Sequence, residues 1–139
     1  MEYRKFGNTY VVRMDKGEEI VEQVKALAVK EGIRLASVQA LGAVNDITVG
    51  VFKTAEKEYL GNDFRGDMEI VSLTGTISTM DGQAYTHLHM SAGNTEGHVF
   101  GGHLNRAVVS ATCEMVVTVI PGEVDRVFSE EIGLNLFKF

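Results

Sequence analysis

Hydrophobic residues recur with the period of an α-helix in residues 15–32. The residues that share one helical face are Ile20, Val21, Val24, Leu27 and Ala28. Asp15 can accept hydrogen bonds from first-turn amides while Glu18 reaches back to it, which is a capping-box pattern. Gly32 supplies the left-handed residue that ends many helices. The pattern therefore predicts one amphipathic helix over 15–32.

Most of the remaining chain is rich in β-branched and aromatic residues, which favour strands. The expected strands are residues 3–14, 35–44, 47–53, 68–78, 84–91, 107–120 and 134–139. Asp81-Gly82 suits a tight turn, so residues 68–91 are expected to form a hairpin. Residues 107–120 are apolar over much of their length, which predicts a central strand covered on both faces. Glu114 within this strand would then need a hydrogen-bonding or charged partner, or a proton.

These elements predict an α+β sandwich, in which a mostly antiparallel, twisted β-sheet packs with one main α-helix. The chain has 139 residues, a length that suits one domain. Its one proline is Pro121, and neither a linker-like stretch nor an internal repeat divides it. We therefore expect residues 1–139 to form a single domain.

Composition excludes some classes of function. The net charge of −6 disfavours an unaided nucleic-acid binder, which needs a basic face to displace counterions from phosphates. The single cysteine, Cys113, forms no intrachain disulfide, suits a reducing cytoplasm, and is expected to be a small buried hydrophobe. No apolar run approaches the roughly 20 residues of a membrane span, and the first residues do not resemble a signal peptide. We expect a cytoplasmic protein that does not enter membranes.

All four histidines lie between His87 and His103. Residues 85–91 alternate in the manner of a strand, so His87 and His89 project from one face, roughly 7 Å apart. Two imidazoles at this separation can converge on one metal ion with bonds of about 2.0–2.1 Å. The pair therefore indicates two ligands of a divalent metal site.

The third ligand is expected from the returning segment, which carries His98 and His103. A hairpin closed by residues 93–97 would place His98 near Ser91 and His103 near His87. The glycines at 101 and 102 indicate a bulge or a close backbone approach, and a bulge would turn His103 onto the histidine face. We predict that His87, His89 and His103 bind the metal, with His98 in a structural or supporting role.

Five segments together resemble a known family, over almost the whole chain: residues 17–21, 42–50, 68–75, 87–91 and 101–104. They are similar to the PPC domain of plants and prokaryotes, whose prokaryotic members carry the description of predicted DNA-binding proteins of the PD1-like type. The resemblance implies an α/β sandwich, a homotrimer, and a metal site, usually zinc, at the positions of His87, His89 and His103. In the family the position of His98 varies. Plant members add a basic AT-hook, and this chain contains no such segment.

Three functions remain open. The first is a metal-binding homotrimer, with zinc or another divalent transition metal, in which the site recognises a small molecule or anion or stiffens the fold. The second is a DNA-binding or transcription-associated regulator, as the family description suggests. The third is a zinc-dependent hydrolase or lyase that uses an open metal position. Its general base would have to be an acid such as Glu69, Glu96 or Glu114.

Overall fold

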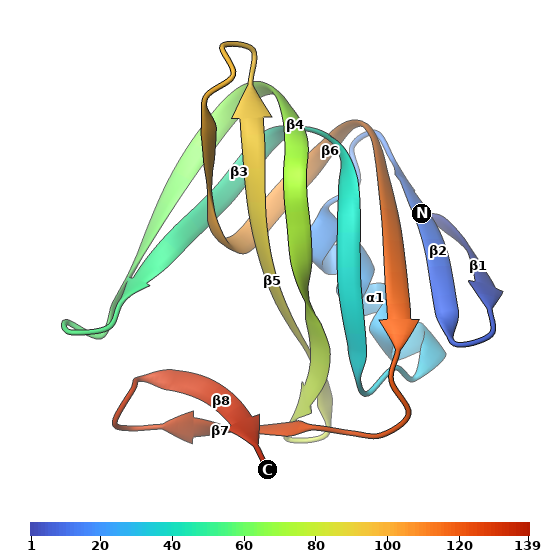
Figure 1. Cartoon of the computed structure of the whole chain (residues 1–139), viewed down its shortest axis with the longest axis vertical. Coiled ribbons are helices and arrows are strands. Elements are labelled where there is room, and N and C mark those ends of the chain that lie inside the picture. Colours follow the sequence, from blue (N-terminus) through green and yellow to red (C-terminus); the bar gives the residue numbers. More distant parts are fainter.

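The computed structural model describes residues 1–139 and contains a single helix in a mostly antiparallel β structure (Figure 1). The elements are β1 (Glu2–Phe6), β2 (Thr9–Asp15), α1 (Ile20–Glu31), β3 (Ala36–Lys53), β4 (Glu58–Met80), β5 (Gln83–Asn94), β6 (Val99–Val119), β7 (Asp125–Ser129) and β8 (Leu134–Lys138). Every strand pairing is antiparallel. The predicted α+β fold is confirmed.

The helix begins later than the capping-box pattern predicts. Glu18 does accept the backbone N–H of Asp15, at 2.8 Å, but this bond closes a turn that precedes α1. Gly17, at φ +89°, interrupts the helical path between the two. The N-cap is Glu19, whose carboxylate accepts two first-turn N–H groups. The end of the helix is as predicted, because Gly32 adopts the left-handed conformation at φ 63°.

The sheet closes on itself through its longest strands. Its order is β1-β2-β6-β3-β4-β5, and β5 also pairs with β6. The first part of β6 pairs with β5 and the rest pairs with β3. His103 lies where the partner changes, opposite His89 on β5 and opposite Gly50 on β3. The closure thus brings residues of three strands to one place.

Several predicted strands differ from those observed. Residues 3–14 form the hairpin of β1 and β2, because Gly7 turns the chain at φ 59°. Apart from Leu35, the predicted strands 35–44 and 47–53 belong to one strand, β3, which passes two register shifts without ending. Strand β4 begins at Glu58, well before the predicted residue 68, and β7 was not predicted. The turn at Asp81-Gly82 is confirmed, with φ values of 50° and 75°.

Within one chain β6 is covered on its inner face only, so the subunit itself does not supply the predicted cover on both faces. The residues of β6 alternate between buried and exposed, and Val116 is 41% exposed on the outer face. Helix α1 packs its apolar side chains against β5 and β6 on the inner face only. Cys113 is buried there, as expected, and burial raises the pKa of its thiol to about 12. Glu114 lies on the outer face, opposite Arg13 and Leu41, and is exposed in the single chain, so it needs no partner inside the subunit.

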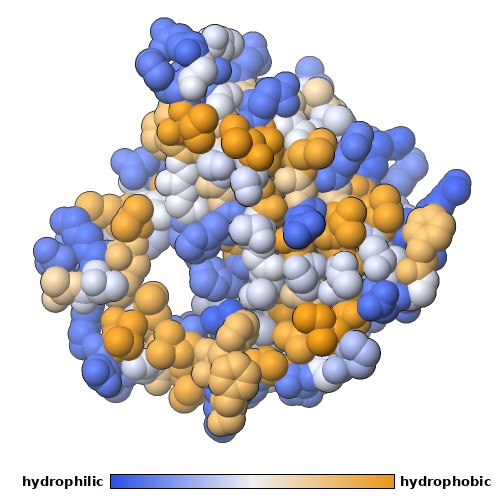
Figure 2. All heavy atoms as spheres, in the orientation of Figure 1, coloured by the Kyte–Doolittle hydropathy of each residue, from blue (hydrophilic) through white to orange (hydrophobic).

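The β7–β8 hairpin crosses the end of the sheet opposite the β5–β6 loop (Figure 1). The backbone N–H of Thr79 donates to the carbonyl of Val124, at 3.1 Å, where the chain enters the hairpin. At the other end, Lys57 Nζ of the β3–β4 turn donates to the carbonyl oxygen of Glu130 at 2.6 Å. The β7–β8 hairpin and the projecting ends of β3 and β4 frame an opening beside the sheet (Figure 2). No helix in the structure has the length and apolar character needed to cross a membrane.

Candidate metal centre

Three of the four histidines converge on the outer face of the sheet. His87 and His89 lie on β5 and His103 lies on β6, with ring centroids 5.1 to 5.6 Å apart. One nitrogen of each ring lies within 4.8 Å of the others. The intervening Leu88 and the following Met90 are buried, which is the alternation that the sequence predicts.

His103 lies on this face, but its strand pairing differs from the predicted one. It lies directly opposite His89, not His87, and no register shift separates the paired residues of β5 and β6. Directly opposed residues of antiparallel strands share a face, so no bulge between these strands is needed. The glycines before it allow close approach: a Cβ on Gly101 would lie 2.3 Å from the carbonyl oxygen of Met90. A Cβ on Gly102 would lie 2.3 Å from the carbonyl oxygen of Gly50.

The histidine electrostatics favour neutral rings. Burial is the main cause that lowers the pKa of His87 to about 4, with smaller contributions from the neighbouring His103, Arg126 and His89. The pKa of His103 is also lowered, mainly by burial and then by His89. A neutral imidazole offers the nitrogen lone pair that a metal requires. At pH 7 both rings are therefore in the ligating form.

The donor set fits one tetrahedral ion. Bonds of about 2.0–2.1 Å to zinc place ligand nitrogens about 3.4 Å apart. The observed nitrogens lie within 4.8 Å of one another, so small side-chain rotations bring them to that spacing. These three residues could hold a divalent metal, with the face of the sheet leaving the remaining side of the ion open.

His98 lies outside the group. It is exposed, and its Nδ1 lies 3.3 Å from the carboxylate of Glu96. None of the three acids suggested by the sequence joins the histidine cluster. Glu69 pairs with Gly93 on β5, and Glu114 pairs with Leu41 on β3. The site therefore contains no general base from that set.

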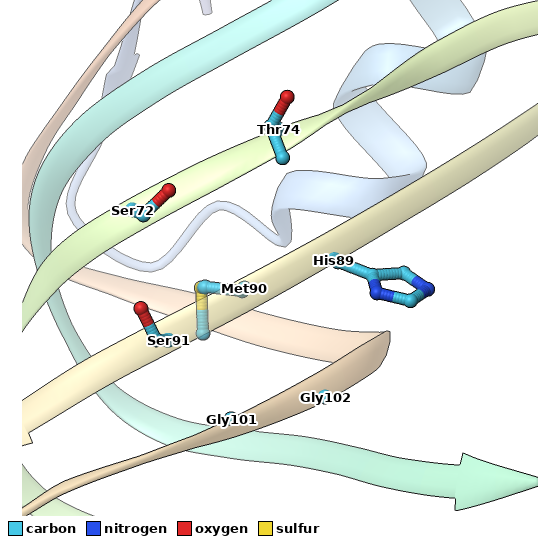
Figure 3. A pocket seen from close by; sticks show the side chains of 7 residues that line it. All are labelled: Ser72, Thr74, His89, Met90, Ser91, Gly101 and Gly102. Carbon is cyan, nitrogen blue, oxygen red and sulfur yellow. The ribbon is translucent and has the colours of Figure 1, made fainter.

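Two features beside the histidines were not predicted. A shallow hollow of about 220 Å³ adjoins His89, and its wall carries the hydroxyl groups of Ser72, Thr74 and Ser91 (Figure 3). On the other side, beyond His87, lies Arg126 of β7, which contacts Ser78 one pair of residues along the same sheet face. The alternation of hydroxyl residues along β4 could have indicated the first feature. No local pattern indicated the second, because Arg126 belongs to an unpredicted strand.

Comparison with known proteins identifies the class of protein. The model of the Plants and Prokaryotes Conserved (PCC) domain matches residues 1–121. A solved structure from Bacteroides thetaiotaomicron, named as a candidate DNA-binding protein, has 35% identity and a TM-score of 0.97, covering 99% of this chain and 96% of that chain. A metal-containing protein from Archaeoglobus fulgidus has 34% identity and a TM-score of 0.90, with coverage of 99% and 97%. A plant- and prokaryote-conserved (PPC) protein from Pyrococcus horikoshii has 33% identity and a TM-score of 0.87, with coverage of 99% and 95%.

A search among curated proteins found no match. The chain belongs to the Plants and Prokaryotes Conserved domain family, which is the family that its sequence resembles.

Proposed function

We propose that this protein binds one zinc ion through His87, His89 and His103. The observation that carries the proposal is the convergence of three imidazole nitrogens within 4.8 Å. The lowered pKa values of His87 and His103 add that these two rings are neutral at pH 7. A similar protein from Archaeoglobus fulgidus is described as metal-containing, which supports a metal in this fold. Three imidazoles suit zinc, although other divalent transition metals accept the same donors. Bound zinc would supply a Lewis acid with an open position.

Elemental analysis of the native protein tests the proposal. We expect about one zinc per chain, as a tetrahedral site with three protein ligands requires. The double variant His87→Ala/His89→Ala should lower the zinc content to near zero. His98→Ala is the matched control, because it removes a histidine outside the cluster, and it should retain the wild-type content. Wild-type protein without metal, or a double variant with unchanged metal, would contradict the proposal.

We favour a binding role for the site over a hydrolase or lyase. The acids that could serve as general bases lie outside the cluster, whereas the hollow beside His89 offers hydroxyl groups that could bind a ligand.

We also infer that the protein assembles as a homotrimer. The outer sheet face, away from α1, carries exposed apolar residues on adjacent strands: Val11 on β2, Val116 on β6 and Leu41 on β3. Hydrophobic side chains gather in several patches on this side of the molecule (Figure 2). Contiguous exposed apolar surface commonly marks an interface. Assembly of identical chains would cover it.

DNA binding is the second candidate, because two of the similar solved structures are named as candidate DNA-binding proteins. The net charge of −6 opposes it. Binding to duplex DNA that weakens steeply with added salt would support this function. The absence of binding at about 150 mM salt would count against it.

We infer that residues 1–139 act as one domain in the cytoplasm. The family model ends at residue 121, but the hairpin that follows is attached to the sheet through Thr79 and Arg126. A single buried cysteine suits a reducing compartment.

A further inference from the structure

Arg126 is a buried cation without an anionic partner. The residue is 7% exposed, and no carboxylate forms an ion pair with it. Its guanidinium lies over the ring of Tyr85, at 4.6 Å from the centroid, and over that of Phe137, at 4.3 Å. A buried charge is costly unless it is paired and hydrogen-bonded.

The protein uses only part of the hydrogen-bonding capacity of this group. Nε donates to Ser78 Oγ at 2.9 Å, and Nη1 donates to the carbonyl oxygen of Asn135 at 2.8 Å. Because a guanidinium has five N–H groups, three remain without a protein acceptor. Only one side-chain polar atom in the protein is both fully buried and without a hydrogen-bond partner, and it is Thr112 Oγ1. The unpaired Nη2 of Arg126 is therefore not fully buried and remains accessible to solvent. Arg126 can therefore donate to a ligand.

The register of β4 and β5 places this guanidinium beside the histidines. Ser78, which Arg126 contacts, pairs with Tyr85, and the next pair on the same face is Thr76 with His87. Successive pairs on one face of a sheet are roughly 7 Å apart along the strands. A small ligand on the metal can span such a distance.

The charges of the site call for an anion. Three neutral imidazoles leave both positive charges of a divalent ion uncompensated, and no acid belongs to the histidine cluster. The Arg126 charge adds to this excess in a partly buried place, where like charges repel more strongly than in water. We propose that Arg126 recognises a small oxyanion, such as a carboxylate group, that also contacts the metal held by His87, His89 and His103. This inference rests on the proposed metal site.

An oxyanion fits both partners. Its oxygens can ligate a divalent metal, and a guanidinium donates charge-assisted hydrogen bonds to carboxylate or phosphate oxygens. The hydroxyl-lined hollow beyond His89 would remain free for polar groups on the rest of the ligand. A carboxylate and a phosphate share the recognised chemistry, so the experiment uses one probe of each kind.

The test uses the full chain loaded with Co²⁺, whose visible spectrum reports a change in coordination. Acetate and inorganic phosphate are titrated as probes, and acetamide serves as a neutral control. Arg126→Met keeps an apolar stem between the two rings but removes the charge. Arg126→Lys restores the charge without the planar fork. Arg106→Met is a matched control, because Arg106 is exposed and paired with Asp46.

We expect at least one of the two anions to bind the wild-type protein, and acetamide not to bind. Arg126→Met should weaken anion binding about tenfold or more, the size expected for loss of hydrogen bonds to a charged group. Arg126→Lys should recover part of the affinity, and Arg106→Met should match the wild type. Stronger binding of acetate would identify the ligand as a carboxylate, and stronger binding of phosphate would identify a phosphate. Metal content should remain unchanged in every variant.

Arg126 also attaches the β7–β8 hairpin, so a structural effect must be separated from recognition. Thr79→Val removes a hydroxyl that lies 3.4 Å from the carbonyl of Val124 and 3.1 Å from the carboxylate of Asp125, and it leaves Arg126 intact. Equal loss of anion affinity in Thr79→Val and Arg126→Met would overturn the proposed recognition. So would anion affinities of Arg126→Met within twofold of the wild type, or no anion binding by the metal-loaded wild type. If the wild type binds no metal, the proposed function itself fails.

Discussion

At the scale of single residues, burial of His87 keeps its ring neutral near pH 7 and makes the stability of the fold sensitive to acid. The pKa of His87 falls from 6.5, the ordinary value expected in the unfolded chain, to about 4 in the folded chain. Between these values the unfolded chain binds a proton that the folded chain does not, so the free energy of unfolding falls as pH decreases from 6.5 to 4.

We therefore predict that His87→Gln flattens the pH dependence of stability in metal-free protein. The contribution of one proton is at most about 1.4 kcal/mol per pH unit, and less here because His87 is only half-buried. Urea denaturation at several pH values from 6.5 to 4, with wild type and variant in parallel, measures the difference. A residual slope is expected because the pKa of His103 is also lowered. Identical slopes in the two proteins would show that the His87 ring does not titrate in this way.

Gly101 provides a second residue-scale prediction. Its missing side chain lets β6 approach β5, since a Cβ would lie 2.3 Å from the Met90 carbonyl oxygen. Gly101→Ala should lower the free energy of unfolding by about 2–4 kcal/mol and weaken zinc binding, because the strands that carry His89 and His103 must separate. Thermal or urea denaturation and a zinc titration measure the two effects. Gly61→Ala is the control, because its Cβ would meet only ordinary contacts at 3.6 and 3.8 Å.

At the scale of elements, the start of α1 depends on Glu19. Its carboxylate accepts N–H groups of the first helical turn and also the N–H of Ala107 on β6, at 2.8 Å. Glu19→Ala should therefore lower the free energy of unfolding by about 2 kcal/mol, more than loss of an ordinary cap. Asp15→Ala should cost clearly less, because the Asp15 backbone N–H that Glu18 accepts remains. If urea denaturation shows that both variants lose the same free energy of unfolding, Asp15 contributes as much as Glu19 at this end of the helix.

The sequence predicts elements best where the signal is local. Gly32 ends the helix and Asp81-Gly82 turns the chain, since both features depend on conformations that few residues adopt. The alternation around His87 and His89 correctly predicts their shared face, because the two-residue period of a strand is also a local signal. The start of α1 was misplaced because a capping box also stabilises a turn outside a helix.

Non-local features could not be read from the sequence. The position of His103 opposite His89 depends on the pairing of β5 with β6. The exposure of Glu114 depends on which face α1 leaves uncovered. Arg126 comes beside the histidines only because β7 crosses the end of the sheet, a connection without a local periodic signal. Each of these features is set by tertiary packing.

At the scale of the whole molecule, we expect metal binding and assembly to be separable. All three proposed ligands belong to one chain, and they lie on β5 and β6 near the point where the sheet closes. The proposed interface uses the outer residues of β2, β6 and β3, including Val116. A change at that surface should therefore alter the oligomeric state without removing a ligand.

We predict that wild-type protein sediments with three times the chain mass, and that Val116→Lys shifts it to monomers. A lysine at this 41% exposed position would place a charge in an apolar contact between chains, where desolvation is costly. Val29→Lys is the control, because Val29 is 65% exposed on α1, away from the outer sheet face, and it should leave the trimer intact. Zinc content per chain should be the same in all three proteins. A wild-type monomer at micromolar concentration would contradict the assembly, whereas loss of zinc together with the trimer would show that a neighbouring chain helps to hold the ion.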